Sequence, residues 1–168
     1  MEEISLRFER PACDSAILVG NGLLASASDE IRRRVPAERY VVAMDGTVAG
    51  FHPTLFRELG ALVIVEGGEG AKTLARYADL CEQILASGID RRTVMIAVGG
   101  GVVGDLVGFV AATLLRGLRV VQVPTTLLAE RRSAYLAADV VLAVAEGETP
   151  GQTAERVVEA ARASGWSG

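Results

Sequence analysis

An apolar run that opens directly onto a glycine turn constrains the fold of this chain more than any other feature. Val94 to Val98 are apolar throughout, and Gly99, Gly101 and Gly104 follow in a G-x-G-x-x-G pattern. Glycine permits a tight turn, lets the backbone approach a pyrophosphate and removes side chains between helix and strand. A helix N-terminus after such a turn offers free N–H groups to phosphates. The pattern predicts a strand–turn–helix unit that either binds a dinucleotide or simply turns a corner.

The rest of the chain repeats this alternation of strand and helix. Its 168 residues suit one domain, and a 50% apolar content with only 5% aromatics is typical of small side chains packing helices onto a buried sheet. We therefore predict an α/β fold: a Rossmann-like, open, mostly parallel sheet of about six to seven strands with helices on both faces. The expected strands are 15–19, 40–44, 62–65, 93–98, 118–123 and 139–145, with weaker alternation over 4–8; the expected helices are 23–35, 47–59, 71–87, 102–116, 127–137 and one that starts at 149–150.

Charge and cysteine content exclude several classes of protein. A net charge of −4 gives no electrostatic footprint for nucleic acid, and the basic cluster 32–34 is interpreted as a solvated helix end. Acidic residues at 2–3 stand where a signal peptide carries base, and the glycines and Asp105 within 93–115 argue against a membrane span, so a cytoplasmic protein is expected. Cys13 and Cys81 have no metal-binding or redox spacing and are expected to be reduced thiols.

Polar residues cluster where the expected strands end. Ligands of open α/β sheets bind beyond the carboxyl ends of the strands. There Asp45 could accept hydrogen bonds from ribose hydroxyls, Lys72 could oppose the charge of a phosphate, and Thr125 could donate a hydroxyl hydrogen bond. Glu69 and Thr126 belong to the same group. Each residue taken alone also fits an ordinary turn; together they predict a site.

The arrangement departs from well-known nucleotide enzymes. The glycine turn follows a late strand and Asp45 lies far upstream, whereas a dehydrogenase fingerprint starts at the first strand with an acid about 20 residues later. No Gly-x-x-x-x-Gly-Lys-[Ser/Thr] segment occurs, which excludes a P-loop kinase. His52 has no metal-ligand partner at a useful spacing, so it predicts no metal site.

Three segments together carry a specific resemblance: Gly67-Gly68-Glu69 followed by Lys72-Thr73-Leu74, then GGGVVGDLVGFVAATLLRG at 99–117, then VQVPTTLLA at 121–129. Over residues 4–129 the chain resembles the N-terminal, NAD-binding domain of 3-dehydroquinate synthase, an enzyme of aromatic amino acid biosynthesis by the shikimate pathway. That family uses NAD and a divalent metal, usually zinc, to convert a heptulosonate phosphate into 3-dehydroquinate with loss of phosphate.

The resemblance also implies roles for individual residues. Arg116 matches an arginine that reaches the substrate phosphate of a neighbouring subunit, which implies a homodimer. Thr47 stands where the family usually has an asparagine, and one ribose contact is thereby in doubt. The implied NAD-binding positions are Asp45, Glu69, Lys72, Gly100, Gly101, Val102, Asp105, Thr125 and Thr126.

After residue 129 the resemblance changes. Residues 127–163 are similar to the C-terminal end of a shikimate kinase, with Arg131 at a shikimate-contacting position, although Ser133 and Ala134 replace the usual Pro-Leu. The domain is thus expected to comprise 1–129, a closing βα unit over 130–163 and a frayed tail over 164–168. Neither the family's metal ligands nor its substrate lysines are recognised in this chain.

These observations predict a chimeric chain that binds NAD and has no turnover by itself. The alternative is a ligand-free α/β scaffold in which the tail covers an exposed sheet edge. A third possibility is a subunit that receives its metal-bearing domain from another protein.

Overall fold

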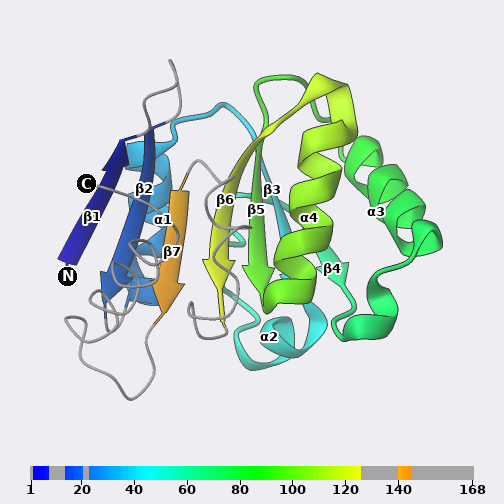
Figure 1. The fold of residues 1–168 in the computed structure, drawn as a ribbon, viewed down its shortest axis with the longest axis horizontal. Helices are drawn as coiled ribbons and strands as arrows, with labels where there is room; N and C mark the ends of the chain where they lie inside the picture. The colour runs from blue at the N-terminus through cyan, green and yellow to red at the C-terminus, as the bar shows by residue number, and fades with distance from the viewer. Residues whose placement is uncertain (1, 8–13, 21–22, 126–139, 145–168) are drawn as a thin grey trace.

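The computed structural model describes residues 2–7, 14–20, 23–125 and 140–144, and these form an α/β fold around one sheet. Figure 1 shows the sheet with α3 and α4 on one face and α1 on the other. The elements are β1 (Glu2–Arg7), β2 (Asp14–Gly20), α1 (Leu23–Arg34), β3 (Tyr40–Asp45), α2 (Gly46–Phe51), β4 (Gly60–Val65), the 3₁₀ turn η1 (Glu69–Ala71), α3 (Leu74–Ala86), β5 (Val94–Gly99), α4 (Gly101–Thr113), the 3₁₀ turn η2 (Leu114–Arg116), β6 (Arg119–Pro124) and β7 (Val140–Val144).

The strands lie in the order β1-β2-β7-β6-β5-β3-β4. β1 is antiparallel to β2, and all other neighbouring pairs are parallel. The parallel sheet with helices on both faces confirms the predicted fold class. Residues 127–137 and 149–163, where two further helices are expected, lie outside the described residues.

β7 corrects one expectation about the C-terminal part. A strand over 139–145 is predicted and found, but it does not cover a sheet edge. It lies inside the sheet, where Ala16 of β2 and Val121 of β6 both pair with Val140. The tail therefore contributes a central strand, which removes the basis for the edge-covering interpretation.

The helix predicted over 47–59 is wrong in length. α2 begins after Asp45 and ends at Phe51, and turns follow up to residue 59. Proline restricts the preceding residue to extended backbone and supplies no N–H, so Pro53 prevents the helix from continuing through His52. Phe56 is nevertheless fully buried at a positive φ of 61°, so this irregular segment still packs on the sheet.

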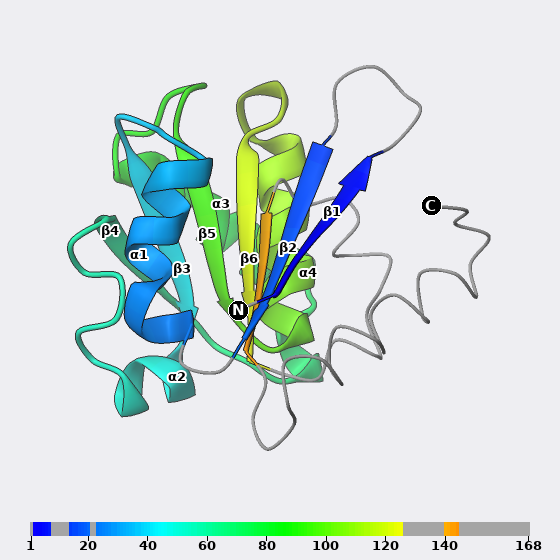
Figure 2. The ribbon, with the colours of Figure 1, turned by 90° about the vertical axis from the view of Figure 1, so that its left-hand side faces the viewer.

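β5 separates two cores. All six of its residues are buried, and successive side chains point to opposite faces. Met95 and Ala97 belong to the α4 face, the core shared with α3 and α4, whereas Ile96 and Val98 belong to the α1 face, the core shared with α1. Figure 2, turned by 90°, shows α1 and α4 on opposite sides of the strands. No helix within the described ranges has the length and apolar character needed to cross a bilayer.

Candidate functional site

Asp45 is held in place by the helix that it starts. Its Oδ1 accepts hydrogen bonds from the backbone N–H groups of Thr47 (2.8 Å) and Val48 (3.4 Å), which makes it the N-cap of α2. Its Oδ2 faces Gly67, where an added Cβ would overlap the carboxylate. A glycine at 67 therefore lets the half-buried carboxylate keep this orientation at the end of β3.

Gly99 brings the end of β5 against the same carboxylate. Its φ is +155°, and a Cβ there would lie 3.0 Å from the Asp45 Cβ and 3.1 Å from the Val103 side chain. The Gly99 carbonyl accepts a hydrogen bond from the Thr125 N–H at 2.9 Å. Asp45, Gly99 and Thr125, which are 80 residues apart at the extremes, thus meet at one edge, as predicted for the carboxyl ends of parallel strands.

The N-terminus of α4 opens at this edge. Gly100 is the N-cap residue in an extended conformation and has no capping side chain, while Gly101 and Val102 form the first turn. The first N–H groups of an α-helix have no intrahelical acceptor and carry a partial positive charge. The structure therefore places the three predicted loop residues where their backbone can receive an anion.

Lys72 and Asp105 form an ion pair across this opening. The Lys72 Nζ lies 3.1 Å from the Asp105 Oδ2, and both side chains are a little over one third exposed. The pair connects the segment between η1 and α3 to α4, just beyond the first turn of that helix. The sequence indicates both residues for the site but does not predict that they bind each other.

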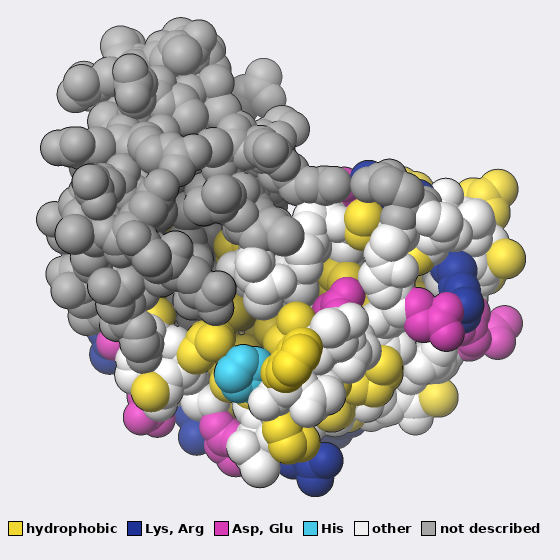
Figure 3. Space-filling view, turned by 90° about the horizontal axis from the view of Figure 1, so that it is seen from below, with side chains coloured by type: hydrophobic (Ala, Val, Ile, Leu, Met, Phe, Trp, Pro, Cys, Tyr) yellow, Lys and Arg dark blue, Asp and Glu magenta, His cyan; other side chains and the backbone are white. Residues whose placement is uncertain are grey.

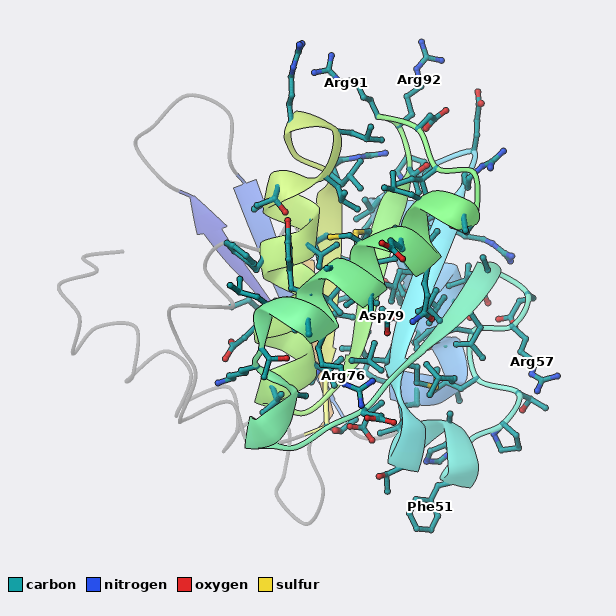
Figure 4. All side chains as sticks on the ribbon, turned by 90° about the vertical axis from the view of Figure 1, so that its right-hand side faces the viewer. Phe51, Arg57, Arg76, Asp79, Arg91 and Arg92 are labelled. Carbon is teal, nitrogen blue, oxygen red and sulfur yellow. The ribbon has the colours of Figure 1, made fainter. Side chains whose placement is uncertain are left out.

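A cavity of about 370 Å³ adjoins Asp45's helix at the same edge. Figure 3 views the molecule from below, and His52 (cyan) lies there among hydrophobic side chains. Phe51 is 79% exposed and points away from the sheet in Figure 4. The cavity is lined by Leu24, Val48, Phe51, His52, Leu55, Val98 and Thr125. Its lining is mostly apolar, which suits a flat ring rather than a phosphate.

Arg116 lies apart from the other site residues. It is exposed at the far end of α4, about 20 Å from the helix N-terminus for a helix of this length. Leu115 and Arg116 both have positive φ values, 51° and 71°, and the Arg91 Nε donates a hydrogen bond to the Leu115 carbonyl at 3.1 Å. Thr126 lies outside the described residues, and of Glu69 only the backbone, at the start of η1, is described.

Sequence analysis missed two features of the site. The cavity residues at the end of α2 were not indicated, although the sequence places Phe51 directly before His52, the single histidine of the chain. Gln122 was also missed: it is 3% exposed on the α4 face and is the one polar residue among the apolar side chains of 120–124. Within the described part of the chain, no group of three or more His, Cys, Asp or Glu is placed to hold a metal ion.

Comparison with known proteins shows which family this chain resembles. Residues 62–137 match the family model for the 3-dehydroquinate synthase N-terminal domain, so the match continues past residue 129, where the resemblance was expected to end. The chain is 45% identical over 121 residues to a 3-dehydroquinate synthase of Bradyrhizobium sp., covering 68% of this chain and 32% of that protein. It is 39% identical over 133 residues to the enzyme of Cereibacter sphaeroides, covering 75% of this chain and 36% of that protein.

Solved structures show the same architecture. A 2-deoxy-scyllo-inosose synthase complexed with carbaglucose-6-phosphate, NAD⁺ and Co²⁺ superimposes with a TM-score of 0.68 at 26% identity, covering 84% of this chain and 44% of that one. A 2-epi-5-epi-valiolone synthase from Streptomyces hygroscopicus, with NAD⁺ and Zn²⁺ bound, shares the fold at 20% identity and a TM-score of 0.64. The chain spans about one third of the length of the curated relatives that it matches. It therefore carries a 3-dehydroquinate synthase-like N-terminal domain, related to sugar phosphate cyclases.

Proposed function

We propose that this domain binds NAD at the carboxyl edge of its sheet. The observation that carries the proposal is the convergence of Asp45, Gly67 and Gly99 beside the uncapped N-terminus of α4. Glycines at 67 and 99 keep this edge free of Cβ atoms, and the helix N-terminus offers N–H groups to an anion. When bound, NAD supplies a hydride acceptor and donor.

Each part of the edge fits one part of the dinucleotide. The N–H groups of Gly101 and Val102 would bind the pyrophosphate, and the Asp45 carboxylate would accept hydrogen bonds from ribose hydroxyls. The mostly apolar cavity beside Thr125 would hold a nucleobase ring. Lys72, paired with Asp105 at the mouth of the site, would add positive charge near a phosphate. Glu69 and Thr126 are included as NAD contacts on the resemblance alone.

We further propose that the 168 residues bind NAD without turnover. The relatives are about three times as long as the stretch that matches, and the described residues provide no set of metal ligands, so we derive no step through a metal. The reaction that the resemblance implies for a full-length enzyme is the conversion of a heptulosonate phosphate into 3-dehydroquinate. We propose that this chain does not perform that reaction by itself. Release of phosphate from that substrate by the purified chain would contradict this part of the proposal.

Arg116 is proposed to contact the substrate phosphate of a second subunit. Its position at the end of α4 opposite the NAD site is incompatible with a contact to NAD in its own chain. The positive φ values at 115 and 116 support a functional role, because strained backbone is retained where the surrounding structure requires it. This role requires a homodimer. We also keep as a proposal that the tail over 130–163 derives from a shikimate kinase, although residues 130–137 belong to the match with the 3-dehydroquinate synthase family model. The parallel strand β7 supports the strand of a closing βα unit there.

The test is the melting temperature with and without millimolar NAD. A ligand at about 100 times its dissociation constant stabilises a protein by roughly 2.7 kcal/mol. We expect an upward shift that Lys72→Ala reduces. Arg92→Ala is the matched control, because Arg92 is an exposed cation at the opposite end of the molecule, as Figure 4 shows. A cooperative melt with no NAD effect would favour the alternative, a ligand-free scaffold.

A further inference from the structure

Gln122 is a buried amide in the middle of the sheet. It pairs with Ala97 of β5 and Val141 of β7, and its side chain is 3% exposed. Its Nε2 donates a hydrogen bond to the Gly104 carbonyl of α4 at 3.1 Å. A buried polar side chain is costly unless it is hydrogen-bonded, so a residue of this kind indicates that the bond itself matters.

Two glycines on α4 make room for this amide. A Cβ at Gly104 would lie 2.9 Å from the Gln122 Oε1, closer than side chains normally approach, whereas a Cβ at Gly108 would lie 3.6 Å from the Gln122 Nε2, an ordinary contact. Gly104 is the last glycine of the G-x-G-x-x-G pattern. The structure thus gives this glycine a specific neighbour, and distinguishes it from the glycine one turn later.

The bond connects the first turn of α4 to β6, the strand that Thr125 directly follows. The Gly104 N–H bonds to the Gly100 carbonyl at 3.0 Å, so Gly104 is one turn from the helix start. The Thr125 N–H bonds to the Gly99 carbonyl on the other side of the same turn. Two contacts near β6 therefore hold the glycine loop. One is the Thr125 N–H just after the end of β6, and the other is the Gln122 side chain within β6.

We propose that Gln122 is a positioning residue for the dinucleotide site. Its amide fixes the height of the α4 N-terminus above the sheet, and thereby the position of the N–H groups that receive the pyrophosphate; the inference rests on the proposed NAD binding. An apolar side chain of equal size would fill the space but give no directional bond, so the helix could rotate or slide. A glutamate would present an acceptor to the Gly104 carbonyl instead of a donor.

The first test compares two ligands in Gln122→Met, which keeps the volume and removes the donor. NAD and adenosine are titrated by calorimetry into this variant and into the unsubstituted chain. We expect NAD to bind about tenfold more weakly, because the displaced α4 N-terminus would lose about one N–H hydrogen bond to the charged pyrophosphate, which contributes at least this factor. Adenosine, which lacks phosphates, should bind as before. A lower melting temperature with unchanged NAD affinity would assign Gln122 a structural role only and overturn the proposal.

The second test adds one methyl group to the same helix at two places. Gly108→Ala should leave NAD affinity unchanged and raise the melting temperature, because alanine favours a helix over glycine. Gly104→Ala has the same propensity gain but should weaken NAD binding. The double variant Gly104→Ala/Gln122→Ala should bind NAD no more weakly than Gln122→Ala alone, since the clash is gone. Two results would contradict the proposal. One is a double variant whose loss of NAD affinity equals the product of the two single losses. The other is an equal NAD affinity of Gly104→Ala and Gly108→Ala.

These outcomes separate the two proposals. An unsubstituted chain that binds no NAD overturns the proposed function and the positioning role together. A chain that binds NAD but tolerates Gln122→Met overturns the positioning role alone. Should Gln122→Met fail to fold, the pair Gly104→Ala and Gly108→Ala still decides, because both changes add a single methyl group to α4.

Discussion

On the α1 face of the sheet, Leu23, Ala27 and Ile31 press an apolar stripe against the strands, whereas on the α4 face a buried amide fits between two glycines. Apolar packing is non-directional and tolerates exchange of similar volumes. A hydrogen bond and a close backbone approach specify one position. Both helices gain stability from apolar packing, since α4 also buries Val103, Val107 and Val110, but the helix whose N-terminus forms the site is positioned by directional contacts as well.

The largest expected effect separates stability from binding on the α1 face. Ile31 is fully buried, and Ile31→Ala should lower the free energy of unfolding by about 2–5 kcal/mol because a cavity replaces the side chain. NAD affinity of the folded protein should not change. Urea denaturation and NAD titration measure the two quantities, with Arg33→Ala on the exposed side of α1 as the control. A large loss of NAD affinity in Ile31→Ala would remove the distinction between the faces.

Asp45 connects both functions at the end of β3. Asp45→Ala should cost about 0.5–2 kcal/mol of stability through loss of the α2 cap, and should also weaken NAD binding. Asp45→Asn keeps a capping oxygen, so stability should be nearly retained while the carboxylate contact to ribose is lost. Chemical denaturation and titration of the two variants separate the roles; equal NAD affinity in both variants and the unsubstituted chain would show that Asp45 is a cap alone.

The end of α4 should yield a smaller, opposite effect. Arg116 has a φ of 71°, which costs an ordinary residue about 1–2 kcal/mol, and glycine avoids this cost while losing some chain entropy. Arg116→Gly should therefore raise stability by up to about 1 kcal/mol. Gly117→Ala, at a φ of 105°, should lower it. Calorimetric melting checks both signs, and destabilisation by Arg116→Gly would show that the arginine side chain stabilises the turn.

The smallest expected effect is a pH dependence that belongs to α1. Hydrogen bonds from Arg33 and Arg34 lower the pKa of Glu30 below its usual value of 4.5. Because the folded-state pKa is the lower one, the stabilisation is complete above about 4.5 and is lost as the pH falls below it. Such pairs contribute a few tenths of a kcal/mol each. Urea midpoints at pH 7 and pH 3 should differ less in Glu30→Gln; an identical pH slope in that variant would assign the acid sensitivity elsewhere.

Much of the fold followed from local patterns. The apolar run 94–98 became β5, and the spacing within 71–87 became α3, which begins at Leu74 after the cap formed by Thr73. The helix predicted over 47–59 was too long because the apolar spacing continues past Pro53, whereas the proline ends the helix. At the site, the strand ends predicted that Asp45, Gly100 and Lys72 lie near one another, and the structure brings them to one edge; their roles in NAD binding stay a prediction. Gln122 was not predicted, because no local sequence pattern shows that a polar residue within a strand will contact a helix.

The sequence by itself determined the order of strands and helices and the turn at Gly99 that only glycine suits, because these depend on periodicity and backbone conformation within a few residues. The tertiary structure decided that β7 lies between β2 and β6, that Lys72 binds Asp105, and that Gln122 meets Gly104. These contacts depend on strand order and on the seating of a helix across the sheet. Local patterns carry no information about either, since both arise only when distant segments pack together.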